Sequence, residues 1–326
     1  MTRRFIARRS FLMVKGVAIV GAGVSGLTCA VVFAERGYRA TIFAEETAQR
    51  TTSAAAAAVW FPYDAEPADD VIAWALETYK LLVDLARDPG TGVSMIELRQ
   101  FSRTGEIQIP QWAIQLGARQ INRDELLPMF MHGFTMNIPL MDTTIYLDYL
   151  AKRFLAAGGE IADNVHFDKL EDVSPEFDLV VNCTGIGAKT LVPDVDLEPH
   201  RGQVVIVPKI DNLSCAVVCD DPPLMYAIPR RNDCVFGGTN EVSNNCDVDP
   251  TSTAGIVAEC SRVLNIDEPK VRAERVGLRP FRKSGVRLER GKLRDGRAVI
   301  HNYGHGGSGF TLSWGCARKV FALASR

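Results

Sequence analysis

The chain has 326 residues, 47% of them hydrophobic and 23% charged, and its formal net charge at pH 7 is −2. That length predicts one large domain or two closely joined domains. The near-neutral charge, without a basic stripe and interleaved aromatic residues, argues against nucleic-acid binding.

The cysteines indicate a reducing, cytoplasmic compartment. Eight are scattered along the chain, and none stands in a C-x-x-C pair. Mostly buried, free thiols are therefore expected. Oxidative pairing of Cys215 with Cys219, or of Cys234 with Cys246, stays open at this point.

The N-terminus carries features that resemble targeting signals. Two pairs of arginines precede an apolar segment within residues 1–12, as in a twin-arginine signal, and residues 16–34 are uncharged. However, the glycines of residues 16–34 fall where a phosphate-binding turn needs them, and no small-residue cleavage site precedes them. We expect residues 1–14 to be a loose N-terminal extension, and we expect no membrane partner.

The next segment predicts a strand, a glycine-rich turn, a helix and a second strand. The strand is expected over residues 15–21, the helix over 24–36 with its end at Gly37, and the second strand over 39–44. These elements make a complete βαβ unit.

The turn of this unit has the pattern G-x-G-x-x-G, and an acid follows 19 residues later at the end of the second strand. Backbone N–H groups at such a turn bind a pyrophosphate, and the acid binds a ribose hydroxyl. Because an acid disfavours a 2′-phosphate, FAD or NAD fits better than NADP. The predicted cofactor-binding residues here are Gly21, Ala22, Gly23, Val24, Ser25, Gly26 and Glu45.

Thr51, Thr52 and Ser53, followed by five alanines, allow two interpretations. Their hydroxyls and small neighbours could contact a pyrophosphate, or the segment could be a helix with a small packing face. The residue types alone leave both open.

The remaining elements are predicted from apolar periodicity. Helices are expected over residues 70–85, 144–157, 252–264 and 309–324, and strands over 96–109, 177–183, 203–208, 225–229, 233–237, 276–281 and 299–302. A hairpin should join the strands at 225–229 and 233–237. This order predicts a mixed α/β protein of two interleaved domains, with a nucleotide domain built from the start, middle and end of the chain.

Other chemistries lack a motif. No Ser-His-Asp order, nucleophile elbow or carboxylate pair stands out. His301 and His305 are four residues apart, but the glycines around them disfavour a helix, and no third ligand is evident, so no metal site is predicted.

Several segments together are similar to the D-amino-acid oxidase / D-aspartate oxidase family. They are the glycine turn, Thr51-Thr52-Ser53 leading to Trp60-Phe61-Pro62-Tyr63, Asn182-Cys183-Thr184-Gly185, Arg201-Gly202-Gln203, Tyr226-Ala227-Ile228-Pro229, Gly277-Leu278-Arg279-Pro280 and His301-Asn302-Tyr303-Gly304-His305-Gly306-Gly307. The resemblance extends from about residue 15 to the C-terminus, and the segment after His301 is the most specific part.

This resemblance implies a Rossmann-like FAD domain of the glutathione-reductase-related type, interleaved with a substrate domain on a large mixed β-sheet. The FAD domain would comprise residues 15–59, 143–193 and 277–326, and the substrate domain residues 60–142 and 194–276. The further cofactor-binding residues implied are Thr51, Thr52, Ser53, Phe167, Thr184, Gly185, Gly304, Gly306, Gly307, Ser308, Gly309, Phe310 and Thr311.

The resemblance also implies the catalytic site. Arg279 matches the guanidinium that grips the substrate carboxylate, Tyr226 the hydroxyl that shares it, and Gly307 the backbone beside the flavin. Phe61, Tyr63 and Ile228 are the candidates for the side-chain pocket. The implied reaction is FAD-dependent oxidative deamination of a D-amino acid by hydride transfer, with dioxygen as acceptor, to a 2-oxo acid, ammonia and hydrogen peroxide.

The chain departs from the family pattern near the predicted substrate entrance. The loop at residues 219–225 is short and contains no tyrosine, whereas Asp220 and Asp221 make it acidic. Tyr63 stands where D-aspartate oxidases tend to have histidine. Because an acidic entrance repels D-aspartate, we expect neutral, bulky or basic D-amino acids as substrates. The chain also ends without a Ser-Lys-Leu tail, which fits a cytoplasmic enzyme.

Alternatives from other classes stay open. A glycine- or sarcosine-type amine oxidase, a D-aspartate oxidase and a flavin-binding protein without turnover share most of these features. An NAD-dependent dehydrogenase would leave the segment after His301 unexplained. A homodimer is left open.

Overall fold

The computed structural model describes residues 16–63 and 65–326, and two β-sheets dominate it. The first sheet has six strands in the order β14 (Arg287–Lys292), β15 (Ala298–Tyr303), β7 (Leu179–Asn182), β1 (Val17–Val20), β2 (Ala40–Phe43) and β6 (Glu160–Ala162). All neighbouring strands run parallel except the edge strand β14, which is antiparallel to β15. The central strand β1 is buried along its whole length, which explains its unbroken apolar sequence.

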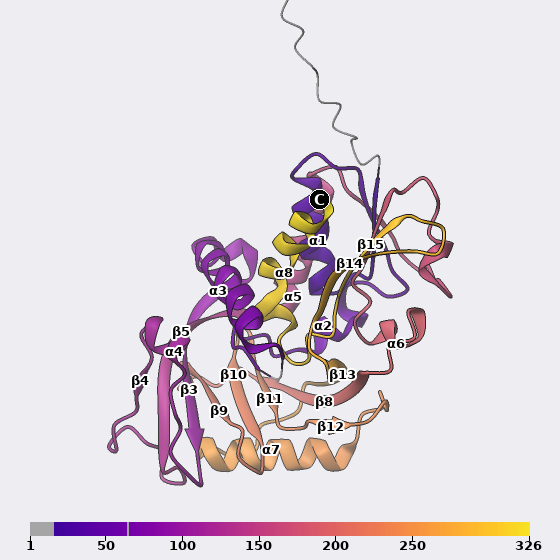
Figure 1. Ribbon diagram of the computed structural model, residues 1–326. Helices are drawn as coiled ribbons and strands as arrows, with labels where there is room; N and C mark the ends of the chain where they lie inside the picture. Colours follow the sequence, from indigo (N-terminus) through magenta and orange to yellow (C-terminus); the bar gives the residue numbers. More distant parts are fainter. Residues whose placement is uncertain (1–15, 64) are drawn as a thin grey trace, which may run out of the picture.

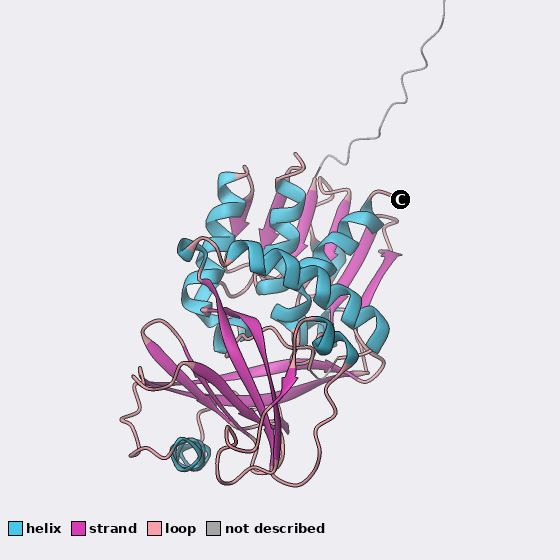
Figure 2. Ribbon diagram, turned by 90° about the vertical axis from the view of Figure 1, so that its left-hand side faces the viewer, coloured by secondary structure: helices cyan, strands magenta, loops and turns pink. Residues whose placement is uncertain are grey.

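Helices cover one face of this sheet. In Figure 2 these helices stand in front of the strands. α1 (Val24–Ala34) packs against α5 (Thr143–Ala156) and α8 (Gly309–Ala324), and α3 (Ala68–Leu85) lies on α8. The opposite face is covered by an apolar cluster in which Ala18, Val20 and Val180 meet Leu170 and Phe177. The six-stranded sheet is therefore enclosed on both sides, as parallel sheets are.

The second sheet has nine strands and lies below the first in the view of Figure 1. Its order is β12 (Glu241–Val242), β8 (Leu197–Pro208), β11 (Asp233–Gly237), β10 (Met225–Pro229), β9 (Cys215–Cys219), β3 (Val93–Ser102), β5 (His132–Met141) and β4 (Arg119–Gln120), and β13 (Ala273–Arg282) also pairs with β8. Helix α7 (Pro250–Leu264) covers its outer face through Ile256, Val257 and Cys260. The inner face looks toward the six-stranded sheet.

Three short helices complete the described structure: α2 (Thr52–Ala55), α4 (Gln111–Gln115) and α6 (Ala188–Leu191). α2 packs on β13 and so bridges the two sheets. Along the described residues, no helix is both long and apolar enough to cross a bilayer.

The mixed α/β fold with a large mixed sheet is confirmed. The predicted helices correspond to α1, α3, α5, α7 and α8, and the hairpin is β10–β11, paired antiparallel. The strand predicted over 96–109 ends at Ser102, and no strand covers 103–110. Strands β4, β5, β6, β9, β12 and β14 were not predicted. Asn137 and Pro139 interrupt the apolar sequence pattern of the continuous strand β5, and β14 is a charged edge strand.

The predicted division into two domains stays a prediction. The boundary before residue 143 falls between β5 and α5, whereas the boundary before residue 277 falls inside β13, which pairs with β8 as far as Arg282. The extension expected over residues 1–14 lies outside the described residues.

The cysteines are all free, so neither possible disulfide forms. Cys246 is exposed and Cys215 is half-buried, while the other six are buried. Burial is the main cause that raises the pKa of Cys215, Cys219, Cys234, Cys260 and Cys316, that of Cys234 to about 12. For Cys29 the pKa is raised chiefly by its contact with Cys183, with burial adding to it.

Candidate functional site

A cavity of about 690 Å³ runs from the glycine-rich turn after β1 to the inner face of the nine-stranded sheet. Its wall at the first end comes mostly from loops at the carboxyl ends of β1, β2 and β7. Its wall at the other end comes from β3, β8, β9, β10 and β13. The cavity therefore joins the two halves of the fold that the sequence assigned to a cofactor and to a substrate.

The glycine-rich turn and the first turn of α1 line the first end. Gly21, Ala22, Gly23, Val24 and Ser25 all face the cavity. Gly26 does not line it; a Cβ there would lie 1.9 Å from the carbonyl oxygen of Gly21, so this glycine lets the helix approach the turn.

Ser53 meets the start of α1 from the neighbouring segment. Its hydroxyl accepts a hydrogen bond from the Val24 amide at 3.0 Å. Thr51, Thr52 and Ser53 line the cavity, and Thr52 and Ser53 also begin α2. Both interpretations of this segment are thus compatible, because a short helix of small residues presents hydroxyls to the cavity. The small run through Ala58 continues the wall.

Glu45 lies at the far end of the cavity with an exposed carboxylate. His166 approaches it with Nδ1 at 3.3 Å from Oε2. This contact raises the pKa of His166 above its usual value. Phe167, Thr184 and Gly185, which the resemblance implied, line the wall nearby.

The start of α8 forms the opposite side of the cavity. Gly306, Gly307, Gly309 and Phe310 line it, and Gly307 is exposed to it. Two helix N-termini, those of α1 and α8, therefore border one cavity, and both favour negative charge.

Ser308 and Thr311 are buried and do not line the cavity. The Ser308 hydroxyl accepts from the Tyr63 amide at 2.7 Å and donates to the Tyr63 carbonyl at 2.5 Å, and Thr311 makes the same pair of bonds with Phe61 at 3.1 and 3.0 Å. Gly304 also lies off the cavity. These hydroxyls fix the segment with Phe61 and Tyr63 against α8.

Strand alternation builds the cavity floor. Residues that face the cavity are spaced by two, and their neighbours in the sequence face α7. The floor residues are Leu98 and Gln100 of β3, Gly202 and Val204 of β8, Val218 of β9, and Tyr226 and Ile228 of β10.

Two glycines make room for the side chains of Arg279 and Tyr226. A Cβ on Gly202 would lie 2.4 Å from both terminal nitrogens of Arg279, and a Cβ on Gly237 would lie 2.0 Å from Cζ of Tyr226. Nη1 of Arg279 also donates to the Thr239 carbonyl at 3.2 Å. Because Gly202 of β8 and Gly237 of β11 have no side chains, the side chains of Arg279 and Tyr226 can lie directly on the sheet.

Electrostatics link these two groups. Burial raises the pKa of the Tyr226 hydroxyl, and the positive charge of Arg279 opposes that rise. The tyrosine is consequently a neutral hydrogen-bond donor beside a permanent cation at neutral pH. This combination suits a carboxylate.

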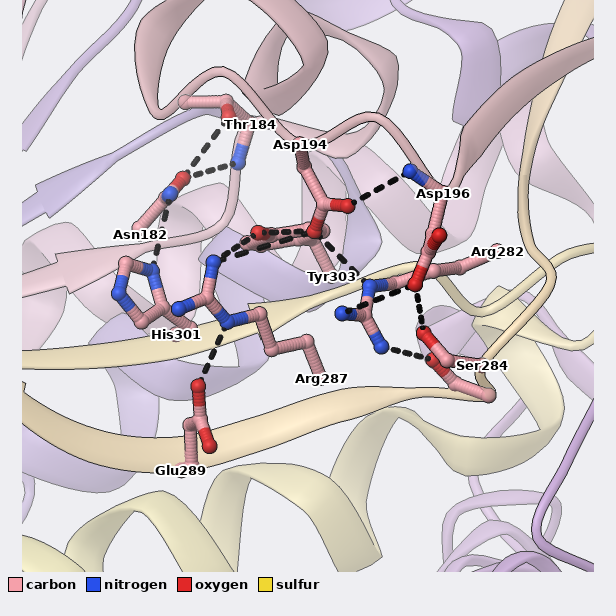
Figure 3. Close-up of polar contacts among 11 residues, drawn as sticks. Asn182, Thr184, Asp194, Asp196, Arg282, Ser284, Arg287, Glu289, His301 and Tyr303 are labelled. Atoms are coloured by element: carbon pink, nitrogen blue, oxygen red, sulfur yellow. Dashed lines mark hydrogen bonds and ion pairs between the residues drawn. The ribbon is translucent and has the colours of Figure 1, made fainter.

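A buried polar network supports the loop that leads to Gly306 (Figure 3). The Tyr303 hydroxyl donates to Asp194 Oδ2 at 2.7 Å, and Arg282 Nε donates to the same oxygen at 2.8 Å. Burial alone would raise the pKa of Asp194, but the hydrogen bonds from Tyr303 and Arg282 hold it below its usual value. The network joins the end of β13 to the end of β15.

The histidines of this loop contact asparagine side chains. Nδ1 of His301 lies 3.3 Å from the Asn182 amide nitrogen, and Nε2 of His305 lies 3.1 Å from Asn302 Oδ1. Burial lowers the pKa of each histidine to about 4. Among the described residues, no group of three or more His, Cys, Asp or Glu side chains is placed to hold a metal ion.

The two aspartates of the short loop after β9 have separate surroundings. Asp221 turns toward the end of β3, where its Oδ2 accepts from the Ser102 hydroxyl and the Arg103 amide at 2.6 Å each. Asp220 lines the cavity, and its Oδ2 accepts from Gln100 at 2.9 Å. Arg103 also donates to the Asp221 carbonyl and to Glu259 of α7, so the loop is fixed at both sides.

Comparison with known proteins identifies the class. A family model described as DAO, FAD dependent oxidoreductase, matches residues 16–323. The chain therefore belongs to this family of FAD-dependent oxidoreductases, and the resemblance found in the sequence is confirmed.

The chain is similar to several oxidases along nearly its whole length. The chain is 42% identical to a D-amino-acid oxidase of Streptomyces coelicolor, over 95% of this chain and 96% of that protein. It is 32% identical to a D-aspartate oxidase of Homo sapiens, over 95% and 94%. A solved structure of glycine oxidase from Geobacillus kaustophilus has a TM-score of 0.79, is 20% identical, and covers 94% of this chain and 93% of that one, which shows the shared fold.

The residues of the cavity fit FAD. Small side chains and backbone line a passage past two helix N-termini, with Glu45 at one end and exposed Gly307 near the other. This arrangement suits a long dinucleotide with a central pyrophosphate.

Sequence reasoning missed the structural roles of Gly202 and Gly237 and the cavity position of Gln100. The available signal was the period-two alternation of β3, β8 and β11. However, the strand pairing that places these residues beside Tyr226 and Arg279 joins distant segments, and no single segment reveals it.

Proposed function

We propose that this protein is an FAD-dependent D-amino-acid oxidase, which converts a D-amino acid and dioxygen to a 2-oxo acid, ammonia and hydrogen peroxide. The observation that carries the proposal is the pair formed by Arg279 and Tyr226, seated over Gly202 and Gly237 at the substrate end of the cavity. The relatives named D-amino-acid oxidase support the same activity.

In this proposal Arg279 grips the substrate carboxylate through two parallel hydrogen bonds, and the Tyr226 hydroxyl donates a third. These contacts fix the position and orientation of Cα beneath the exposed backbone at Gly307. Phe61, Tyr63 and Ile228 enclose the substrate side chain, and Phe61 and Tyr63 are held by their bonds to α8.

FAD, when bound, supplies the two-electron acceptor for the hydride from Cα and passes the electrons to dioxygen. The chain would hold it through the glycine-rich turn, Ser53, Glu45 and the backbone of Gly306 and Gly307. The amine lone pair forms the imine as the hydride leaves, and water then hydrolyses the imine. No acid or base side chain is required at Cα, so the protein acts by alignment and electrostatics.

The test is the visible spectrum of the FAD-loaded protein under anaerobic conditions, before and after addition of D-alanine, L-alanine and D-aspartate. The expected result is bleaching of the flavin band by D-alanine and not by L-alanine. A flavin band that no D-amino acid bleaches would refute the proposal. Bleaching by sarcosine or glycine in place of D-alanine would move the function to that class of amine oxidase.

We also propose a cytoplasmic location, which the eight free cysteines support. A homodimer stays a proposal that light scattering of the purified protein would test.

A further inference from the structure

The cavity floor changes in character from one side to the other. Arg279 and Tyr226 lie over Gly202 of β8 and Gly237 of β11, whereas Val218, which is paired with Tyr226 from the neighbouring strand β9, is apolar. Beyond Val218 lies Asp220, one residue past the end of β9. A substrate held by its carboxylate would therefore extend its side chain over an apolar surface toward a carboxylate.

Asp220 lies directly after the sheet. It is one residue past the end of β9 and lines the cavity, as Val218 does within the strand. Gln100, buried and paired in register with Val218, donates from Nε2 to Asp220 Oδ2 at 2.9 Å. This bond fixes one carboxylate oxygen and leaves the group facing the cavity.

Asp220 lacks a cationic partner within the described part of the chain, since no arginine, lysine or histidine there forms an ion pair with it. Asp220 is exposed to the open cavity, yet the protein around it still raises the pKa of its carboxyl by desolvation, and the Gln100 hydrogen bond opposes that rise. A ligand bound in the cavity would cover this carboxylate, and a cation on that ligand would then pair with it. The adjacent Asp221 offers no such site, because the end of β3 already satisfies it.

Strand geometry sets the length of the ligand that would reach this group. Tyr226 is paired directly with Val218, and Asp220 follows Val218 by two residues, one residue past the end of β9. Strand spacing and rise then separate Tyr226 and Asp220 by about 8 Å between Cα atoms. A four-carbon stem that ends in an ammonium matches this span, whereas a methyl side chain does not.

We propose that Asp220, positioned by Gln100, is the end of the side-chain subsite and selects D-amino acids whose long aliphatic side chain ends in a cation, such as D-lysine, D-ornithine and D-arginine. This inference rests on the proposed D-amino-acid oxidase activity and specifies the class of D-amino acid that the enzyme would prefer. The stem of the substrate would cover Val218, while the cationic end pairs with Asp220. Acidic D-amino acids would meet this carboxylate and be rejected.

The test compares D-lysine with D-norleucine, which has the same four-carbon chain without the ammonium. Steady-state kcat/KM is measured for both with the FAD-loaded wild-type protein, Asp220→Asn, Asp220→Glu and Asp211→Asn. Asparagine keeps the volume and the acceptor for Gln100 but removes the charge. Asp211 carries the same charge in the turn before β9, away from the cavity wall.

In Asp220→Asn the ratio of kcat/KM for D-lysine to that for D-norleucine should fall about tenfold or more, the usual size of a lost charge-assisted hydrogen bond. Asp220→Glu should retain most of the ratio, and Asp211→Asn should leave it unchanged. An unchanged ratio in Asp220→Asn, including an equal loss for both substrates, would overturn the inference. Oxidation of D-norleucine by the wild type keeps the proposed function standing in that event, whereas no oxidation of any D-amino acid refutes both.

Discussion

At the six-stranded sheet the cavity wall is largely backbone: a glycine-rich turn, a run of alanines and the starts of two helices. At the nine-stranded sheet the wall consists of separate side chains, each from a different strand and spaced by the alternation of the pleat. Both halves depend on glycine. In the first half Gly26 lets helix α1 approach the glycine-rich turn, and in the second half Gly202 and Gly237 leave room for the side chains of Arg279 and Tyr226.

The difference teaches how each half tolerates change. A wall of backbone depends on the chain path, so its failures should appear as lost stability or lost cofactor. A wall of side chains depends on a few functional groups, so its failures should appear in substrate binding while the fold survives.

The largest effect is expected in the stability of the cofactor half at acidic pH. His301 and His305 have a pKa of about 4 in the fold and about 6.5 when unfolded, so the unfolded chain binds more protons between these values. Their stabilisation is complete above pH 6.5 and is lost as the pH falls toward 4. The free energy of unfolding should fall by about 2 kcal/mol per histidine from pH 7 to pH 5.

Urea unfolding at the two pH values, with and without added FAD, measures this loss. Carboxylates contribute little in this window because they titrate at lower pH. His166 acts in the opposite direction, since its pKa is raised, but it is exposed beside Glu45 and screened by solvent. An equal free energy of unfolding at pH 7 and pH 5 would contradict the prediction.

Removal of the Arg279 side chain should give the next largest effect. In the proposed site, Arg279→Ala would remove a bidentate, charge-assisted contact worth about 3 kcal/mol, so KM for D-amino acids should rise about a hundredfold. FAD should remain bound. Arg279→Lys keeps the positive charge but loses the two parallel donors of the guanidinium, so its KM should lie between those of the wild type and of the alanine variant. If the alanine variant keeps the wild-type KM, Arg279 is not part of the substrate site.

A smaller loss should follow from a methyl group placed under the guanidinium. In Gly202→Ala the new Cβ would meet the end of the Arg279 side chain, which can move, so the fold should persist while KM rises about tenfold. Gly255→Ala is the matched control, because a Cβ there meets open space on α7. Steady-state kinetics and thermal unfolding of both variants distinguish displacement of the Arg279 side chain from damage to the β-sheet. A lower Tm with a normal KM would show that the substitution disturbs the sheet and not the position of Arg279.

The smallest kinetic effect is expected at the exposed end of the cofactor wall. Glu45→Gln should weaken FAD binding by about 1 kcal/mol, since it weakens a single solvent-exposed hydrogen bond to a ribose hydroxyl. Turnover at saturating FAD should stay as in the wild type. Fluorescence titration of the apoprotein with FAD gives the affinity, and equal values in both proteins would remove Glu45 from the cofactor site.

The same contrast explains what the sequence could reveal. The βαβ unit with Gly21 and Glu45 was predictable because one continuous segment contains its strand, turn, helix and acid. The final helix after His301 was predictable for the same reason. In both places the local pattern and the fold agree.

The substrate half was less accessible because its information is non-local. The resemblance implied Arg279 and Tyr226, but the floor beneath them depends on the pairing of β8 with β13 and of β10 with β11. Asp220 and Asp221 are neighbours in sequence and seemed equivalent as charges. Only the structure separates them: just past the end of β9, Asp220 lines the cavity, whereas Asp221 is bonded to the end of β3.

The burial of the cysteines has a consequence for an enzyme that would release an oxidant. Peroxide attacks thiolates, and a raised pKa keeps a thiol protonated and unreactive. Six of the eight cysteines, namely Cys29, Cys215, Cys219, Cys234, Cys260 and Cys316, have a raised pKa. Cys246 is the exposed one, and mass spectrometry of peroxide-treated protein should find oxidation there first; earlier oxidation of a buried cysteine would contradict this order. If the protein releases hydrogen peroxide as proposed, the fold thus keeps most of its thiols in the unreactive, protonated form over many turnovers.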